Sequence, residues 1–227
     1  MAEPHRRLSG EERRHRLLTS AQDLFGKRGY RSTEVDDIAH RAGVTKPMLY
    51  RHFPGGKAEI FLAVLEGHMN ALMRVLWEAL ASSSEPRRRL HHGLDAYIGY
   101  AEANTAGFRL LAQAPAEFEP AVSKRMEEFR ELIARGLTHT IADVMKAAGL
   151  PADGAPLYAQ AMLGGAESVT RWWIDRGKTP AREVIVDHLL VFMWRGFDGL
   201  PRHPGRFHEL TDRPSPPGTS RPPRAVR

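Results

Sequence analysis

The sequence predicts an all-α protein, and three observations support that fold class. Apolar residues recur at helical spacing in successive stretches between residues 11 and 199, and glycine or proline separates most of them. No stretch shows the alternation of apolar and polar residues, bounded by turn signals, that is typical of β-strands. The composition, with 42% hydrophobic and 26% charged residues, is that of an ordinary globular protein. We therefore expect a small N-terminal domain of three helices and a larger C-terminal helical domain.

The first helix is predicted over residues 11–28. Its apolar stripe has helical spacing and consists of Leu17, Ala21, Leu24 and Phe25, with Leu18 widening it. Ser9 and Glu12 have the spacing of a capping box, in which each side chain satisfies a backbone N–H of the other's residue. Gly29 follows the last turn and is expected to end the helix in a left-handed conformation.

Two short helices are predicted next. Residues 33–42 carry one apolar face, with Thr33 as the expected N-cap, and Gly43 breaks the helix. Thr45 is the expected cap of a third helix that runs to about Phe53. Two short helices around a glycine-containing turn, preceded by a longer supporting helix, are typical of the helix-turn-helix motif. In that motif the second short helix enters the major groove of DNA.

The remainder of the chain predicts further helices and a basic tail. The expected helices cover residues 58–82, 87–103, 106–113, 120–148, 155–176 and 181–199. Seven prolines and six arginines in residues 201–227 predict a disordered tail, since such a segment buries little apolar surface. The expected organisation is therefore a basic arm, a helix-turn-helix domain, a helical effector-binding and dimerisation domain, and the tail, at residues 1–10, 11–57, 58–200 and 201–227.

Charge is distributed unevenly along the chain, whose net charge is +6. Residues 1–57 contain 12 Lys and Arg against 7 Asp and Glu, residues 58–200 contain 15 against 18, and residues 201–227 contain 6 against 2. The two basic ends around a mildly acidic middle favour one face that binds a polyanion such as DNA. Solvated arginines that bind nothing are the alternative, both for the arm, with Arg6 and Arg7, and for the tail.

Several function classes lack the residues that they need. The chain has no cysteine, which excludes disulfides and thiolate chemistry, and its eleven histidines show no metal-ligand spacing. No nucleophile elbow, phosphate-binding glycine loop or paired-acid signature occurs, so we expect neither an enzyme nor a cofactor. No apolar run of about 18 residues and no secretory signal is found, and the protein is expected in the cytoplasm without a membrane partner. A module that binds proteins through its N-terminal helices is the remaining rival.

Fixed spacings across residues 11–65 resemble the N-terminal signature of the TetR/AcrR transcriptional regulators. The matching residues are Ala21-Gln22-Asp23-Leu24-Phe25, Gly29-Tyr30, Thr33, Val35, Asp37-Ile38-Ala39, Ala42-Gly43-Val44, Leu49-Tyr50-Arg51-His52-Phe53-Pro54 and Lys57. One departure is Gly55-Gly56, where the family has a single residue before the lysine. The resemblance implies a homodimer that binds a palindromic operator in double-stranded DNA. It also implies repression until a small-molecule effector binds, although the same residues are compatible with activation.

The side chains on the third helix suggest a division of roles in such a protein. Thr45, Lys46, Met48 and Arg51 are expected to read bases, and Thr33, Tyr50, His52 and Lys57 to contact the DNA backbone. The alternatives are that Tyr50 belongs partly to the core, that His52 only packs, and that Arg51 is a solvated charge. The added glycine makes the role of Lys57 the least secure.

The C-terminal domain is expected to hold an effector and a dimer interface. Apolar residues that could line a cavity for a lipophilic effector are Phe108, Leu111, Met126, Phe129, Met162 and Trp173, with Gln113 or Glu117 as polar anchors. By resemblance the last two helices form a four-helix dimer interface, for which Gly165, Val169, Ile185, Leu189 and Phe192 are candidates. Ordinary core packing within one subunit is the alternative for both groups.

Overall fold

The computed structural model describes residues 9–112 and 118–198, and this part of the chain is helical without a strand. The helices are α1 (Gly10–Arg28), α2 (Val35–Ala42), α3 (Lys46–His52), α4 (Gly56–Ala81), α5 (Pro86–Ala103), α6 (Thr105–Leu111), α7 (Pro120–Ala147), α8 (Ala155–Asp175) and α9 (Arg182–Asp198). The all-α prediction is confirmed. The arm up to residue 8, Gln113, Glu117 and the tail from residue 201 lie outside the described residues.

Both ends of α1 were predicted to carry a cap. The capping box is confirmed: the Glu12 N–H donates to Ser9 Oγ at 3.1 Å, and the Ser9 N–H donates to Glu12 Oε2 at 2.7 Å. Gly29 has a positive φ of 77°, but its ψ of 170° is not that of a left-handed helix. The prediction was therefore right about the need for glycine and wrong about the conformation. The chain leaves α1 extended because Tyr30 must turn into the core.

The start of α2 differs from the prediction. Glu34, not Thr33, is the N-cap residue, and it makes no side-chain capping bond. Thr33 is fully buried, and its hydroxyl donates to the Gly29 carbonyl at 2.8 Å. The hydroxyl closes the turn after α1 and cannot also cap α2. Gly43 ends α2, as predicted, and it does so in the left-handed conformation, with φ of 68° and ψ of 34°.

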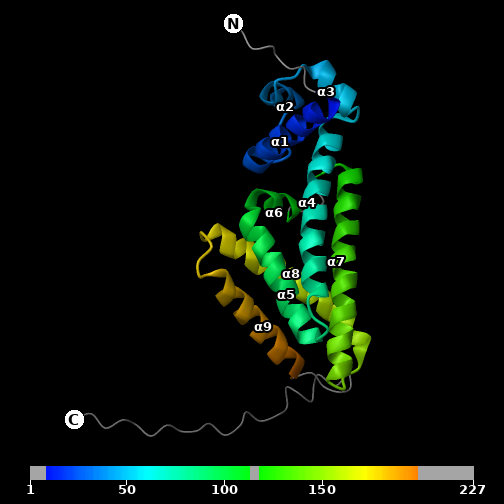
Figure 1. Cartoon of the computed structure of the whole chain (residues 1–227), viewed down its shortest axis with the longest axis vertical. Helices are drawn as coiled ribbons and strands as arrows, with labels where there is room; N and C mark the ends of the chain where they lie inside the picture. Colours follow the sequence, from blue (N-terminus) through cyan, green and yellow to red (C-terminus); the bar gives the residue numbers. More distant parts are fainter. Residues whose placement is uncertain (1–8, 113–117, 199–227) are drawn as a thin grey trace, which may run out of the picture.

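The long helix α4 begins at Gly56, two residues earlier than predicted, and belongs to both parts of the molecule. Gly56 has a φ of +64°, and the Gly55 N–H donates to the Glu59 carboxylate at 2.7 Å. From there α4 contacts α1 and continues beside α5, α6 and α7 (Figure 1). Among the described residues it is the one helix long and apolar enough to cross a membrane. Its contacts with these four helices account for its apolar composition.

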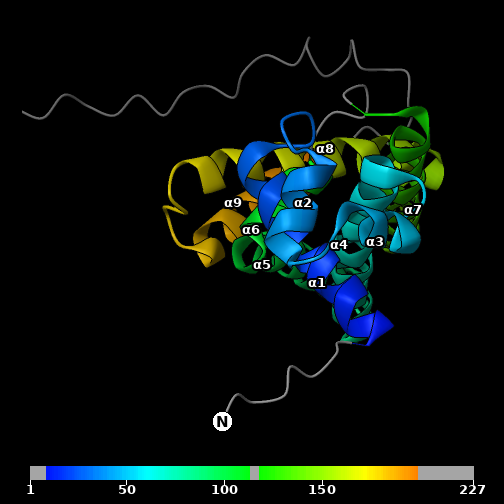
Figure 2. The same cartoon turned by 90° about the horizontal axis from the view of Figure 1, so that it is seen from above.

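The helices form a small head and an elongated body. Helices α1, α2 and α3 gather at one end, and α4 and α7 run side by side away from them (Figure 1). A view from above shows α1 to α3 clustered over this end of the body (Figure 2). The core is continuous from head to body: Phe61 of α4 packs against Phe25 at 4.9 Å and against Phe118, before α7, at 5.0 Å between ring centroids.

Candidate DNA-binding surface and effector cavity

Helix α3 lies at the free end of the head, on the far side from the body (Figure 1). Leu49 and Phe53 are fully buried and attach α3 to α1, α2 and α4. This packing leaves Lys46 and Arg51 exposed, and the Tyr50 side chain is 41% exposed. The sequence therefore places one apolar side of α3 in the core and presents the other to a partner.

Lys46 is held by α2. Its Nζ lies 2.9 Å from Asp36 Oδ1, and the hydrogen bond to this carboxylate raises the pKa of Lys46 above its ordinary value. Both side chains are exposed, so water and salt screen the pair. Lys46 is thus charged and preoriented at the start of α3, and it can exchange Asp36 for a DNA acceptor.

The extra glycine of the sequence supports Tyr50. A Cβ at Gly56 would lie 3.4 Å from Tyr50 Cε1 and 3.8 Å from its hydroxyl oxygen. The ring of Tyr50 therefore rests on the backbone at Gly56 while its other side is exposed. Gly56 also needs its positive φ, so both the space and the conformation favour glycine there.

Lys57 and Thr33 are not presented together with the α3 side chains. The Nζ of Lys57 lies 4.8 Å from the centre of the Tyr30 ring and donates to the Arg31 carbonyl at 3.4 Å. Because α4 begins at Gly56, Lys57 is in the first turn of the helix and turns toward the loop after α1. Thr33 is buried, with its proton already donated. The phosphate contacts of both residues stay predictions.

The other predicted DNA contacts surround α3. Thr45 is exposed at its N-terminus and makes no side-chain capping bond, Met48 and His52 are half-buried, and Arg51 is exposed. His52 lies close to Gly10, the first residue of α1. Nearby, the Arg14 guanidinium lies 5.1 Å from the centre of the Phe53 ring. Arg14, which follows the acidic first turn of α1, thus adjoins α3.

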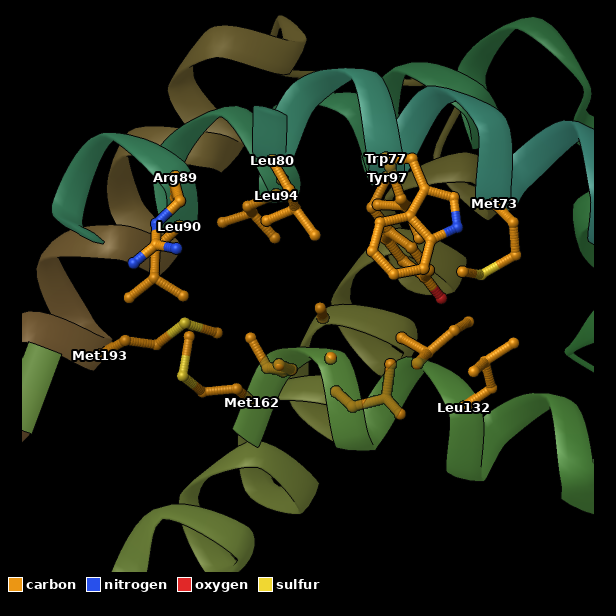
Figure 3. A pocket seen from close by; sticks show the side chains of 17 residues that line it. Met73, Trp77, Leu80, Arg89, Leu90, Leu94, Tyr97, Leu132, Met162 and Met193 are labelled. Atoms are coloured by element: carbon orange, nitrogen blue, oxygen red, sulfur yellow. The ribbon is translucent and has the colours of Figure 1, made fainter. Parts of the chain in front are cut away.

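The body contains an apolar cavity of about 100 Å³ between α4, α5, α7 and α8, with one contribution from α9 (Figure 3). We call it the main compartment. Of its 17 lining residues, Arg89 is the one charged residue. Arg89 and Met193 lie at one end of the view, and Trp77, Tyr97 and Leu132 lie at the other. An apolar, elongated ligand fits this lining.

A second compartment of about 30 Å³ adjoins the first on the side of α6. Of the predicted effector contacts, Met162 lines the main compartment, and Phe108, Leu111 and Phe129 line the second one. Met126 and Trp173 line neither, because both are buried in the core, where the indole N–H of Trp173 donates to the Pro180 carbonyl at 2.6 Å.

Sequence reasoning missed the contribution of α4 and α5 to the cavity, which includes Met73, Trp77, Leu94 and Tyr97. One signal was available. Trp77 is a large apolar residue of α4, and in the structure it is 57% exposed at the cavity. A large side chain that the helix does not need for its own packing favours a ligand or partner.

Helices α8 and α9 present apolar side chains to the outside. Val191 and Phe192 of α9 are 58% and 79% exposed, and Leu157 and Trp172 of α8 are also exposed. Ile185, predicted as a dimer contact, is instead buried in the core of its own chain. Val169 and Leu189 are half-buried against the same core, and Gly165 has open space at its Cβ position. Of the predicted contacts on α9, Phe192 is therefore exposed and Ile185 is not, because the helix is apolar on two sides and one of them packs on its own chain.

An exposed second helix after a glycine turn, on a body with an apolar cavity, defines a helix-turn-helix transcription regulator. Residues 17–64 match the model for bacterial regulatory proteins of the tetR family, and residues 86–196 match the tetracyclin repressor-like C-terminal domain. The chain therefore belongs to the TetR family of bacterial regulatory proteins. Proteins of this family are DNA-binding transcription regulators and not enzymes, and this holds for the chain.

Individual relatives agree with this assignment. The HTH-type transcriptional activator FasR of Mycolicibacterium smegmatis is 31% identical over 196 residues, which cover 86% of this chain and 87% of that protein. A TetR-like transcriptional regulator from Rhodococcus sp. RHA1 has a similar structure, with a TM-score of 0.73 and 25% identity over 86% of this chain and all of that one. The TetR family regulator PfmR from Thermus thermophilus shares the fold, with a TM-score of 0.67 and 24% identity over 79% of this chain and 97% of its own.

Proposed function

We propose that this regulator binds a two-fold symmetric operator as a homodimer and that an apolar effector in the main compartment changes its affinity for DNA. The observation that carries the proposal is the lining of this cavity, in which 16 of the 17 residues are uncharged. Binding sites for small molecules are concave and mostly apolar, with few polar groups. Effector control follows if the effector binds one orientation of the two α3 helices better than another.

The DNA contacts in this proposal come from α3. Lys46 exchanges its bond to Asp36 for a guanine edge, and Thr45, Met48 and Arg51 reach neighbouring bases. Tyr50 and His52 donate hydrogen bonds to backbone phosphates that flank these bases. Because the proposed partner is DNA, the proposed place of action is the cytoplasm.

The dimer in this proposal is formed by α8 and α9. Their exposed Leu157, Trp172, Val191 and Phe192 make an apolar surface of the composition found in interface cores. In this dimer each copy covers these residues of the other, because a two-fold symmetric interface is formed by the same patch of both subunits.

The route from effector to DNA passes through α6. This helix lines the second compartment with Phe108 and Leu111 and contacts α1 on its other side. A Cβ at Gly26 of α1 would lie only 3.2 Å from Ala106 Cβ of α6. Because the two helices pack so closely, a displacement of α6 moves α1 and with it the head.

Two direct experiments test the proposal. In gel-shift titrations with DNA from upstream of the protein's own gene, Lys46→Ala and Tyr50→Phe should lose specific binding, whereas Asn70→Ala, at an exposed position of α4, should bind as wild type.

The second experiment tests the cavity. The fluorescent apolar dye anilinonaphthalene sulfonate should bind wild type and should bind Gly136→Leu at least tenfold more weakly. Gly136 lines the cavity and has open space at its Cβ position. Gly67→Leu is the matched control, since Gly67 is exposed on α4 with equally open space. Unchanged DNA or dye binding in the test variants contradicts the proposal.

The sign of regulation has two candidates. Repression is the family expectation from the sequence, and activation is favoured by the name of the FasR relative, a transcriptional activator. Transcription in vitro from the upstream promoter, with and without the protein, separates them. Less transcript on addition of the protein supports repression, and more transcript supports activation.

A further inference from the structure

The two compartments adjoin across side chains that line both. They share three lining residues, Tyr97 of α5, Ile133 of α7 and Leu163 of α8. Tyr97 is the largest of the three and is buried. Displacement of the Tyr97 ring would therefore open one space toward the other.

Tyr97 is held in this position from the far side. Its ring packs edge-to-face against Phe108 of α6, with centroids 5.8 Å apart and planes at 83°. Phe108 is itself buried and lines the second compartment. A ligand that passes Tyr97 must therefore break this aromatic contact and reach the side chains of α6.

The main compartment has a small volume for a long ligand. At about 100 Å³ it is smaller than the ~150 Å³ apolar cavity that accommodates benzene. Met73, Met162 and Met193 line it from three different helices, and such unbranched side chains can move aside. The walls along the cavity can thus widen, whereas Tyr97, on the side away from Arg89 (Figure 3), lies between this cavity and the second compartment.

The second compartment is less favourable to apolar groups. Arg130 Nη2 lies 2.9 Å from Glu167 Oε1, and both residues line this space. The Glu167 side chain is only 15% exposed. An apolar chain that entered here would remove the remaining water from this ion pair, and that desolvation is costly.

We propose that the effector is an extended apolar chain and that Tyr97 determines the chain length beyond which the affinity stops rising. The inference rests on the proposed effector site in the main compartment. A chain with one end near Arg89 grows along the apolar lining until it meets the Tyr97 ring. Further carbons must displace the ring from Phe108 and approach the Arg130–Glu167 pair, so they add no affinity.

The test measures affinity against chain length by isothermal titration calorimetry of the full chain. The probes are straight-chain carboxylates from octanoate to stearate, whose carboxylate can exchange for Asp143, the partner of the Arg89 guanidinium at 2.8 Å. In wild type the affinity should rise about fourfold per methylene, the effect of burying one CH₂, and then level off. In Tyr97→Ala the rise should continue to longer chains. Tyr97→Phe keeps the ring and should match wild type.

Tyr97→Leu is the second variant, since it fills more of the core if Tyr97→Ala does not fold. It should also move the point of levelling to longer chains. An unchanged length dependence in every folded variant that lacks the ring overturns the role of Tyr97 and leaves the effector site intact. Failure of wild type to bind any chain while it binds anilinonaphthalene sulfonate overturns the extended-chain class alone. Failure to bind the dye as well overturns the proposed function.

Discussion

The phenol of Tyr30 donates a hydrogen bond to the carboxylate of Glu119, which joins the head to the first residues of α7. Tyr30 follows Gly29, the C-cap residue of α1, and Glu119 is the N-cap residue of α7. Burial, and then the hydrogen bond to Glu119, raise the pKa of Tyr30 above its ordinary value. The phenol therefore stays protonated and keeps its donor across the physiological range.

Tyr30→Phe removes this bond and should lower the free energy of unfolding by about 1.5–3 kcal/mol, the range for a hydrogen bond to a charged acceptor. Urea denaturation measures the change. Glu119→Gln should have a similar effect, and the double variant should be less destabilised than the sum, since both remove one interaction. Strict additivity would mean that the two residues are not coupled.

Gly26→Val should separate α1 from α6. Its Cβ would meet Ala106 Cβ at 3.2 Å, and the two additional methyl groups need still more room. Overpacking of this kind costs about 1–3 kcal/mol of unfolding free energy. Gly67→Ala is the contrast: it has open space in α4 and should stabilise by up to about 1 kcal/mol through helix propensity. Equal unfolding free energies for the two variants would refute the close packing.

Stability should fall in mild acid because of His68. Its Nδ1 lies 3.0 Å from the Tyr100 hydroxyl, which donates to the His68 carbonyl at 3.2 Å, and its Nε2 is buried without a partner among the described residues. Burial lowers the pKa of His68 below its ordinary value of 6.5. The unfolded chain therefore binds more protons just below that pH, and the contribution to stability is lost as the pH falls toward the folded pKa.

The measurement is the urea midpoint of wild type and His68→Gln at about pH 7 and about pH 5, a range in which ordinary histidines titrate. Wild type should lose more stability than the variant over this range. The same loss in both proteins would assign the pH dependence to other groups.

Phe192→Asp should produce monomers. The side chain is 79% exposed in one chain, so the change affects the isolated subunit little but places a charge in the proposed dimer interface. Size-exclusion chromatography with light scattering gives the mass, and DNA affinity should fall by at least tenfold because one half-site contact is lost. Asn70→Asp, on the exposed side of α4, should remain dimeric. A dimeric Phe192→Asp protein would argue for another interface.

Features set by local chemistry were predictable from the sequence. The Ser9–Glu12 box and the end of α2 at Gly43 depend on residues a few positions apart, and both were predicted correctly. Thr33 was misassigned because a threonine before a helix can bond forward or backward, and only the packing of the turn after α1 decides.

Features set by the relative rotation of helices were not predictable. Helix α9 is apolar on two sides, so its pattern alone could not tell whether Ile185 or Val191 faces the core. For the same reason Tyr97 and Trp77 were missed at the cavity: a stripe identifies a buried face, and the space between faces depends on how the helices meet. The exact role of Lys57 also depended on where α4 begins.

The continuity of α4 matters for anyone who exchanges DNA-binding heads between relatives. Phe61 lies four residues beyond the predicted boundary at residue 57, yet its ring packs on Phe25 and on Tyr30. A chimera joined at that boundary would take its recognition helix from the donor protein, but it would take Phe61, which packs on the head, from the recipient protein. The junction should instead follow Leu65, so that the whole ring cluster on the head side travels with the helix that reads the DNA.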